Sequence, residues 1–526
     1  MTFDNEISSG NVATVQENHT TATRNSIFGL SFDGGQIVAL LLVLFAIAPL
    51  TYPGFFQSHS GFLPIYNLYD LERQGHRLDW LPTVGQDFDP FRHSGALPYA
   101  VAEAFRRLGL TAPKAILASY AVSFLLSAWA MYRWTRRWLG STASLLSAAV
   151  YTYLPYHLMT VYVRGSLADA WILAMWPVVF WSAHGLSDRG RWKRYLVLTL
   201  LSLVLLCTAN LGLGLLTMPF LATYIWACGG LAGTTAVTVT LLSVAVSTGA
   251  AHALAAPFTP PVEFSAHFPY LFQLISPDWN IDGQPGHWID GLPLQVGLPA
   301  LGLGLLTLVL MWLGRPGAEE ESTFSTYGFS THGLRSLRYW LIVLVAVGLL
   351  VLARLDFVWH LLGWNHLVTY PWQLLGLMGF ALAALGGVTV ALDRHLRPVL
   401  VRTGLVTFVV LASYNYLSPR FFDFDINFTP EEKLEHRHVM VPRQAPIAIL
   451  GDNQVALLDY RLEGPLRHGA TVRVNLLWQA LRPLQKDYVA FVHAVDQEGT
   501  IWGQRDQEPH AGEYPTSKWG QGEIVA

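Results

Sequence analysis

Long apolar segments separated by shorter polar stretches recur along most of the chain. A helix needs on the order of 20 apolar residues to cross a bilayer core of about 30 Å. Backbone polar groups in lipid need partners within their own segment, so such spans have to be helical. The pattern predicts about eleven transmembrane helices, near residues 35–53, 115–133, 141–157, 168–186, 194–209, 212–229, 234–256, 293–313, 338–354, 371–392 and 399–417.

The two ends of the chain follow other patterns. Residues 1–34 are polar and lack an apolar stripe, which is typical of a disordered tail rather than a cleaved signal. From about residue 440, short segments such as 472–478 and 488–495 alternate between apolar and polar positions. This alternation predicts a small antiparallel β-sandwich over 440–526. We expect its sheet to be incomplete, because the chain stops in the lead-in to another strand.

Basic residues predict the orientation. Clusters of Arg and Lys follow the second, fourth, eighth and tenth predicted spans, around residues 133–137, 189–194, 315–338 and 394–402. Short cytoplasmic loops carry such an excess, so the N-terminus is expected in the cytoplasm. The transmembrane domain then covers 35–420, and the segments 54–114, 257–292 and 355–371 face outward together with the C-terminal domain.

Composition agrees with this class and excludes others. Apolar residues make up 52% of the chain and charged residues only 13%, whereas a soluble domain has roughly a quarter charged residues. The formal net charge of −3 does not favour nucleic-acid binding. The two cysteines, Cys207 and Cys228, lie inside apolar runs, so a disulfide framework and a zinc site are not expected.

Candidate chemistry gathers in the predicted outer segments. Carboxylates can accept a proton from a sugar hydroxyl or hold a divalent cation such as Mg²⁺ or Mn²⁺, and arginine can clamp a phosphate. Aromatic rings pack against sugars and lipid chains. The segments together suit a lipid-phosphate-linked substrate that approaches from the membrane. The candidates are His59, Asp70, Asp87, Asp89, Tyr156, His157, Arg164, Asp169, Asp278, Trp279, His287, Trp372 and Gln373.

Each candidate also has a simpler interpretation. An outer-loop Asp is more often solvated than catalytic, and Arg164 can snorkel or pair with Asp169 five residues later. Histidines such as His59 and His287 make loop hydrogen bonds by default, because no two lie at metal-ligand spacing on a predicted helix. Tryptophans serve as interface anchors. Asn210 is expected to satisfy a helix break.

Several short motifs in 35–420 suggest a family. They are His59 with an amphipathic stretch, Trp80-Leu81-Pro82, Leu97-Pro98-Tyr99, Tyr153-Leu154-Pro155-Tyr156-His157, Tyr162 to Asp169, Thr208-Ala209-Asn210, Ser276 to Trp279, Leu294-Gln295-Val296-Gly297 and Tyr370-Pro371-Trp372-Gln373. Their order resembles the bacterial 6-pyruvoyl-tetrahydropterin-synthase-related membrane protein family, which is similar to GT-C membrane glycosyltransferases. The histidine cluster of a soluble pterin synthase has no counterpart in this sequence.

The resemblance implies a GT-C-like helical bundle in the bacterial plasma membrane, with an outward-facing active site and a polyprenyl-phosphate-linked sugar as donor. An acidic residue of the first outer loop would act as base or metal ligand, which points to Asp87, Asp89 or Asp70. Arg164 would hold the donor phosphate, and the motif at Gln295 would contribute to substrate binding. The C-terminal domain looks like β-sandwich modules attached to such proteins and would bind an extracytoplasmic glycan acceptor.

The sequence departs from the family pattern at two positions. Ser60 stands after His59, where an Asp is expected, and Gln373 stands where an Arg is expected. Three functions therefore stay open: a glycosyltransferase, a catalytically inactive scaffold or lipid-glycan-binding protein, and a transporter or flippase. The last ranks third, because ionisable residues gather in outer loops instead of mid-span and no internal repeat is present.

Overall fold

The structure is a computed structural model of the chain. The residues that it describes are 26–27, 30–31, 33–61, 63–73, 95–230, 232–255, 264–279, 292–313, 331–396, 398–421, 448–451, 453–463, 473–495, 501–509, 514–521 and 523–525. Of these described residues, 69% are helical, and the C-terminal part has a small sheet region. The expected combination of a helical domain with C-terminal strands is therefore present.

A helix lies in each predicted transmembrane segment. The first seven are α1 (Gly34–Ile47), α5 (Ala112–Thr135), α6 (Ser141–Thr152), α8 (Leu167–His184), α9 (Trp192–Ala209), α10 (Leu211–Ala227) and α11 (Gly233–Ala255). The others are α12 (Leu298–Leu313), α14 (Thr331–Leu350), α16 (Leu375–Leu392) and α17 (Val399–Ala412). Within the described part of the chain, six helices are long and apolar enough to cross a membrane. This is consistent with a multi-pass membrane protein, whereas the count of about eleven spans is not confirmed.

Two predicted spans differ from the observed helices. The segment 141–157 is broken, because α6 ends at Thr152 and the short helix α7 (Pro155–Tyr162) begins at Pro155. Proline has no N–H for the helical ladder but fits well in a first turn. The segment 293–313 becomes helical only at Leu298, after Gly297, whose φ of 95° is the left-handed region.

The predicted outer segments contain short helices as well as loops. Segment 54–114 contains α2 (Leu63–Arg73) and α4 (Ala96–Arg107). Segment 355–371 contains α15 (Asp356–Leu362). In α2 and α4, Asn67 Nδ2 donates to the Tyr99 hydroxyl at 2.8 Å, so these two helices are tied together.

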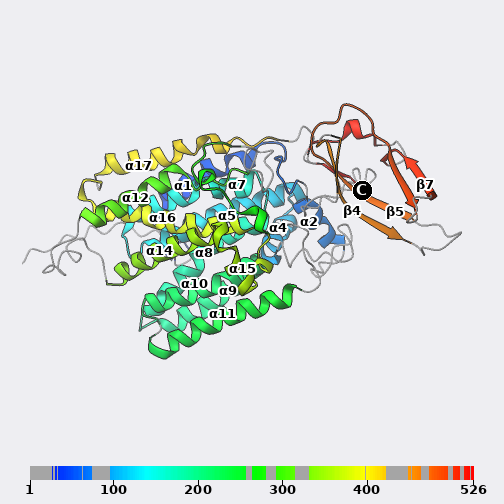
Figure 1. The fold of residues 1–526 in the computed structure, drawn as a ribbon. Coiled ribbons are helices and arrows are strands. Elements are labelled where there is room, and N and C mark those ends of the chain that lie inside the picture. The colour runs from blue at the N-terminus through cyan, green and yellow to red at the C-terminus, as the bar shows by residue number, and fades with distance from the viewer. Residues whose placement is uncertain are drawn as a thin grey trace, which may run out of the picture.

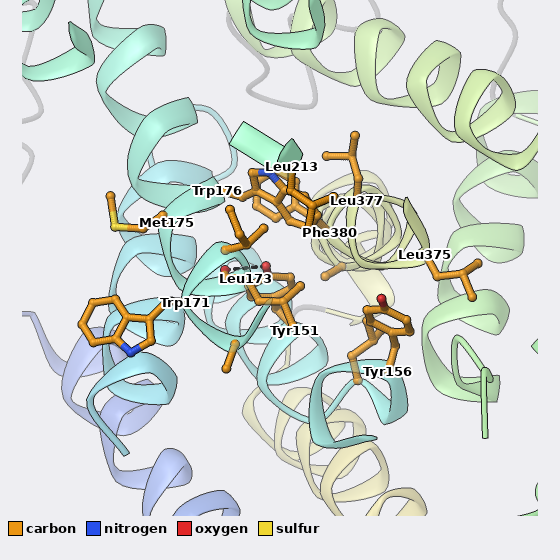
Figure 2. Packing of buried hydrophobic residues seen from close by; sticks show 14 of the residues in the cluster. Tyr151, Tyr156, Trp171, Leu173, Met175, Trp176, Leu213, Leu375, Leu377 and Phe380 are labelled. Carbon is orange, nitrogen blue, oxygen red and sulfur yellow. Dashed lines mark hydrogen bonds between the residues drawn. The ribbon is translucent and has the colours of Figure 1, made fainter. Parts of the chain in front are cut away.

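Aromatic side chains form the centre of the helical body. The Trp134 ring stacks on Phe380 with centroids 4.7 Å apart, and Phe180 meets Trp340 edge to face at 4.9 Å. Figure 2 shows side chains of α6, α8, α10 and α16 meeting, with Tyr151 bonded to the Leu173 carbonyl. Such ring pairs stabilise by about 0.5–1.5 kcal/mol beyond the area they bury.

Helix α16 is central and α11 is peripheral. In the apolar segment that contains α16, 89% of the residues are buried, against 17% in that of α11. Small residues allow this central position, since a Cβ at Gly387 would lie 2.6 Å from the Ala143 carbonyl oxygen of α6. Close backbone approach through glycine is typical of helix packing in membranes.

One end of the helical body is arginine-rich, and we call it the basic end. Here Arg136 pairs with Asp33, which caps α1, and Arg137 lies 4.9 Å from the Trp181 ring and 4.6 Å from Tyr195. At this end Arg402 also donates to Thr142 at 2.7 Å. Residues of the basic clusters after the second and tenth predicted spans thus make contacts at this end of the bundle, and the orientation of this end in the membrane stays a prediction.

The C-terminal strands form two antiparallel sheets. One has the order β3-β4-β5-β8 and the other pairs β6 with β7. The strands are β3 (Ala448–Leu450), β4 (Val455–Glu463), β5 (Arg473–Ala480), β6 (Ala490–Val495), β7 (Ile501–Gln507) and β8 (Ile524–Val525). Figure 1 shows them beyond the end of the helical body where α2 and α4 lie. In the predicted tail, β1 (Ser26–Ile27) pairs with β2 (Leu30–Ser31).

Candidate functional site

The turn between α7 and α8 carries the charged pair of the candidate site. Gly165 adopts a φ of 64°, which reverses the chain after Arg164. Ser166 then caps α8, because its Oγ accepts from the Asp169 backbone N–H at 3.3 Å. Asp169 in the first helical turn also interacts favourably with the helix dipole. The local sequence therefore brings Arg164 and Asp169 together.

Asp169 is the centre of a buried polar network. Arg164 Nη1 donates to its Oδ2 in a charged hydrogen bond. The Asn210 amide donates to Oδ1 at 3.0 Å, and the Gln373 amide donates to Oδ2 at 2.9 Å. The side chains of Arg164 and Asp169 are 13% and 7% exposed. We call these four residues the Asp169 network; it joins α8, the α9–α10 junction and the start of α16.

Asn210 has a second role that sequence reasoning missed. Its extended backbone separates α9 from α10, and its Oδ1 caps α10 by accepting from the Leu213 N–H at 3.1 Å. This is the helix-break role that was expected. The remaining Nδ2 group bonds Asp169, 41 residues away in the chain. The only signal in the sequence was a polar residue between two apolar segments.

Gln373 performs a task that the expected arginine could not. Its Oε1 accepts from the backbone N–H groups of Thr369 at 3.0 Å and Tyr370 at 3.1 Å. These bonds fix the amide so that Nε2 faces Asp169. Arginine has donors but no acceptor, so it could not satisfy those two backbone groups. The departure from the family pattern therefore has a structural consequence.

Aromatic rings cover one side of Arg164. Its guanidinium carbon lies 4.5 Å from the centre of the Trp372 ring, which stacks on Tyr370 at 4.9 Å. His267 lies 5.1 Å from the Tyr370 ring. Burial lowers the pKa of Arg164, but the Asp169 carboxylate together with Tyr156 and Tyr370 outweighs this, so the pKa lies above its ordinary value. Arg164 is therefore a permanent cation held against aromatic faces.

The segment around His59 runs along the Arg164 turn. The His59 N–H donates to the Val163 carbonyl and the Ser60 N–H to the Arg164 carbonyl, both at 2.9 Å. On the other side of the turn, the Tyr120 hydroxyl donates to the Gly165 carbonyl at 2.5 Å. His59 and Ser60 are thus placed beside Arg164 by backbone bonds, and Ser60 stands where a carboxylate was expected.

Two α7 candidates have different surroundings. The Tyr156 hydroxyl donates to the Gln373 carbonyl at 3.3 Å, so Tyr156 adjoins the Asp169 network. His157 is fully buried, with its ring stacked on Phe124 at 4.5 Å and its Nδ1 3.1 Å from the Tyr151 carbonyl oxygen. His157 therefore belongs to the aromatic core.

A separate corner holds three further candidates. Trp279 lies 4.6 Å from the Tyr416 ring, and the Tyr416 hydroxyl donates to Gln295 Oε1 at 2.9 Å. Next to them, Asp278 is exposed and accepts from the Ser276 hydroxyl at 2.8 Å. This corner and the Asp169 network both adjoin α7.

The predicted acidic catalysts are not placed by the structure. Asp87, Asp89 and His287 lie outside the described residues, and for Asp70 only its position in α2 is described. Among the described residues, no group of three or more His, Cys, Asp or Glu side chains could hold a metal ion. The divalent cation and its ligands therefore stay predictions.

No protein-family profile, curated protein or solved structure matches this chain. The resemblance to the pterin-synthase-related membrane family and to GT-C glycosyltransferases accordingly stays a prediction that rests on the motifs. Function is therefore inferred from the chemistry of the Asp169 network and its surroundings.

Proposed function

We propose that the protein is a GT-C-like membrane glycosyltransferase that moves a sugar from a polyprenyl-phosphate carrier to an extracytoplasmic glycan or glycolipid. The observation that supports this most is the largely buried Arg164, oriented by Asp169 and covered by Trp372. One guanidinium nitrogen is committed to Asp169, and the remaining N–H groups suit phosphate oxygens. An aromatic face beside them suits a lipid chain or a sugar ring.

The proposed reaction assigns one task to each group. Arg164 holds the donor phosphate, and Asp87 or Asp89, or alternatively Asp70, acts as general base with or without a divalent cation. An acceptor hydroxyl oxygen bonds to the anomeric carbon while the bond from that carbon to the phosphate oxygen breaks. The base takes the hydroxyl proton, and polyprenyl phosphate leaves with the bonding electron pair.

Asp169 itself is unsuited to serve as the base. Its carboxylate accepts from Arg164, Asn210 and Gln373 at once. Both of its oxygens are therefore engaged by donors from the protein. Asp169 is better suited to orient Arg164, in the way that a supporting group orients a ligand-binding side chain.

Because Asp169 already accepts three hydrogen bonds within the protein, a second function is also supported. A protein with the same network but without a working base would bind a lipid-linked glycan and not transfer it. Ser60 beside Arg164, in the position of the expected carboxylate, supports this alternative. It predicts glycolipid binding that is unaffected when Asp87 and Asp89 are changed to Asn.

Radiolabelled polyprenyl-phosphate sugars, offered as a panel to the purified full chain in nanodiscs, test the proposal. We expect transfer or donor hydrolysis with at least one sugar, and its loss in Arg164→Gln. Arg107→Gln is the matched control, because Arg107 is exposed and pairs only locally with Glu103. Folded protein that binds the donors but neither transfers nor hydrolyses any of them would support the scaffold function instead.

A further inference from the structure

The corner formed by Trp279, Gln295 and Tyr416 contains buried donors without acceptors. Gln295 is only 3% exposed, and its Nε2 has no hydrogen-bond partner within the described part of the chain. The same is true of the buried Nε1 of Trp279. Leaving a buried donor unpaired costs about 1–3 kcal/mol. Two such groups in one corner, without acceptors among the described residues, suit a ligand that accepts hydrogen bonds.

The hydrogen bond from Tyr416 determines which polar atom of Gln295 lacks a partner among the described residues. The Tyr416 hydroxyl donates to Oε1 at 2.9 Å, so the amide oxygen is occupied and the amide N–H₂ is the available group. Tyr416 also packs against the Trp279 ring at 4.6 Å. The two unpaired donors therefore lie at the ring pair of Trp279 and Tyr416. Contacts within the protein, rather than a ligand, set their orientation.

The corner and the Asp169 network both adjoin the start of α7. The Tyr156 hydroxyl bonds the Gln373 carbonyl. Gly297, two residues after Gln295, lies so close to Pro155 that an added Cβ would be 2.6 Å from the proline ring. Adjacent residues of α7 thus contact the Asp169 network and the segment that carries Gln295.

The chemistry of this corner favours sugar hydroxyls over phosphate. It offers two neutral N–H donors and aromatic rings, and its nearest charged residue in the chain is Asp278, an exposed carboxylate. A carboxylate repels a phosphate. We propose that Trp279, Gln295 and Tyr416 bind the sugar ring of a glycan, while Arg164 binds the phosphate. This division deepens the proposed function and rests on it.

Binding of free sugars tests the assignment without requiring transfer. The probes are glucose, galactose, mannose and N-acetylglucosamine, titrated calorimetrically into the full chain in nanodiscs free of glycolipid and sugar detergent. Gln295→Glu removes the amide donor and keeps an acceptor for Tyr416, and Trp279→Phe removes the indole N–H and keeps a ring. Each change should weaken binding of the preferred sugar about tenfold, as expected for one lost hydrogen bond.

Matched controls separate this assignment from the proposed reaction. Trp312→Phe, at an exposed position on α12, should leave sugar binding unchanged. No binding of any of the four sugars, or equal binding by wild type and both corner variants, would overturn the assignment and leave ordered water as the occupant. Sugar binding that is sensitive to Gln295→Glu in a protein without transferase activity would support the corner and reject the reaction.

Discussion

The two ends of the helical body both contain a buried polar centre, but only one is charged. At the basic end, the Tyr224 hydroxyl accepts from Trp134 Nε1 at 3.0 Å and bonds His184 Nδ1 at 2.9 Å. At the other end, a carboxylate and a guanidinium are buried together with two amides. We call the first centre the Tyr224 cluster.

The difference concerns what each centre needs in order to be stable. The Tyr224 cluster is surrounded by rings, including Phe180 at 5.2 Å and Trp340 at 5.7 Å, so packing supplies much of its stability. In the Asp169 network, each charge depends on the other, because an unpaired buried charge is far costlier than an unpaired neutral group. A protein retains such an arrangement at a cost, which is why we place function there.

Removing the carboxylate should have the largest effect. Asp169→Leu leaves the Arg164 cation buried without a counter-charge, and we expect a loss of about 3–5 kcal/mol in stability. The thermal unfolding midpoint in detergent should fall accordingly. The double variant Arg164→Met/Asp169→Leu should recover much of that loss. A single variant as stable as the wild type would show that the pair is solvated in the protein.

Gln373→Leu should come next. It removes one donor to the carboxylate, and a hydrogen bond to a charged group stabilises by about 1.5–3 kcal/mol. It also leaves the N–H groups of Thr369 and Tyr370 without the side-chain acceptor. The same unfolding measurement checks the effect. Gln373→Glu retains the acceptor for these N–H groups but places a second carboxylate beside Asp169, so it should not restore stability.

A change in the Tyr224 cluster should have a smaller effect. Tyr224→Phe keeps the ring packing and removes the hydroxyl that Trp134 and His184 share. We expect a loss of about 1–2 kcal/mol for the buried polar groups left unpaired. A loss as large as that of Asp169→Leu would mean that charge is not what distinguishes the two ends.

The smallest expected effect is a pH dependence of local stability at the exposed carboxylate of Asp487. The Ser517 side chain and backbone N–H bond Asp487 and hold its pKa below the ordinary value. A lowered pKa in the folded state stabilises above the unfolded pKa of about 3.9, and this contribution is lost as the pH falls through the folded value. Hydrogen exchange near residues 514–521 should therefore increase slightly below about pH 4. Asp487→Asn should remove that dependence.

Part of this architecture could be predicted from local pattern. Hydropathy located a helix in every predicted span, since burial in lipid or in a helical bundle demands long apolar segments. The position of Asp169 five residues after Arg164 indicated that the two could pair, because one turn brings them together. The break at Pro155 was missed, although proline at that position is a local signal.

Other features depended on distant contacts. Gln373 is 204 residues from Asp169, and Asn210 is 41 residues from it. No local pattern indicates that these amides share one carboxylate. The family resemblance suggested that Gln373 lay near a site, but it did not suggest that the amide oxygen would bind the backbone of Thr369 and Tyr370.

The sequence by itself determined the class of protein, the helical segments, the C-terminal strands and the local Arg164–Asp169 turn, because apolar length, alternation and capping act over a few residues. Tertiary structure alone decided which amides complete the network and which donors, at Trp279 and Gln295, are left without acceptors. Whether a buried polar atom is satisfied depends on what packs against it, and that partner can come from any part of the chain.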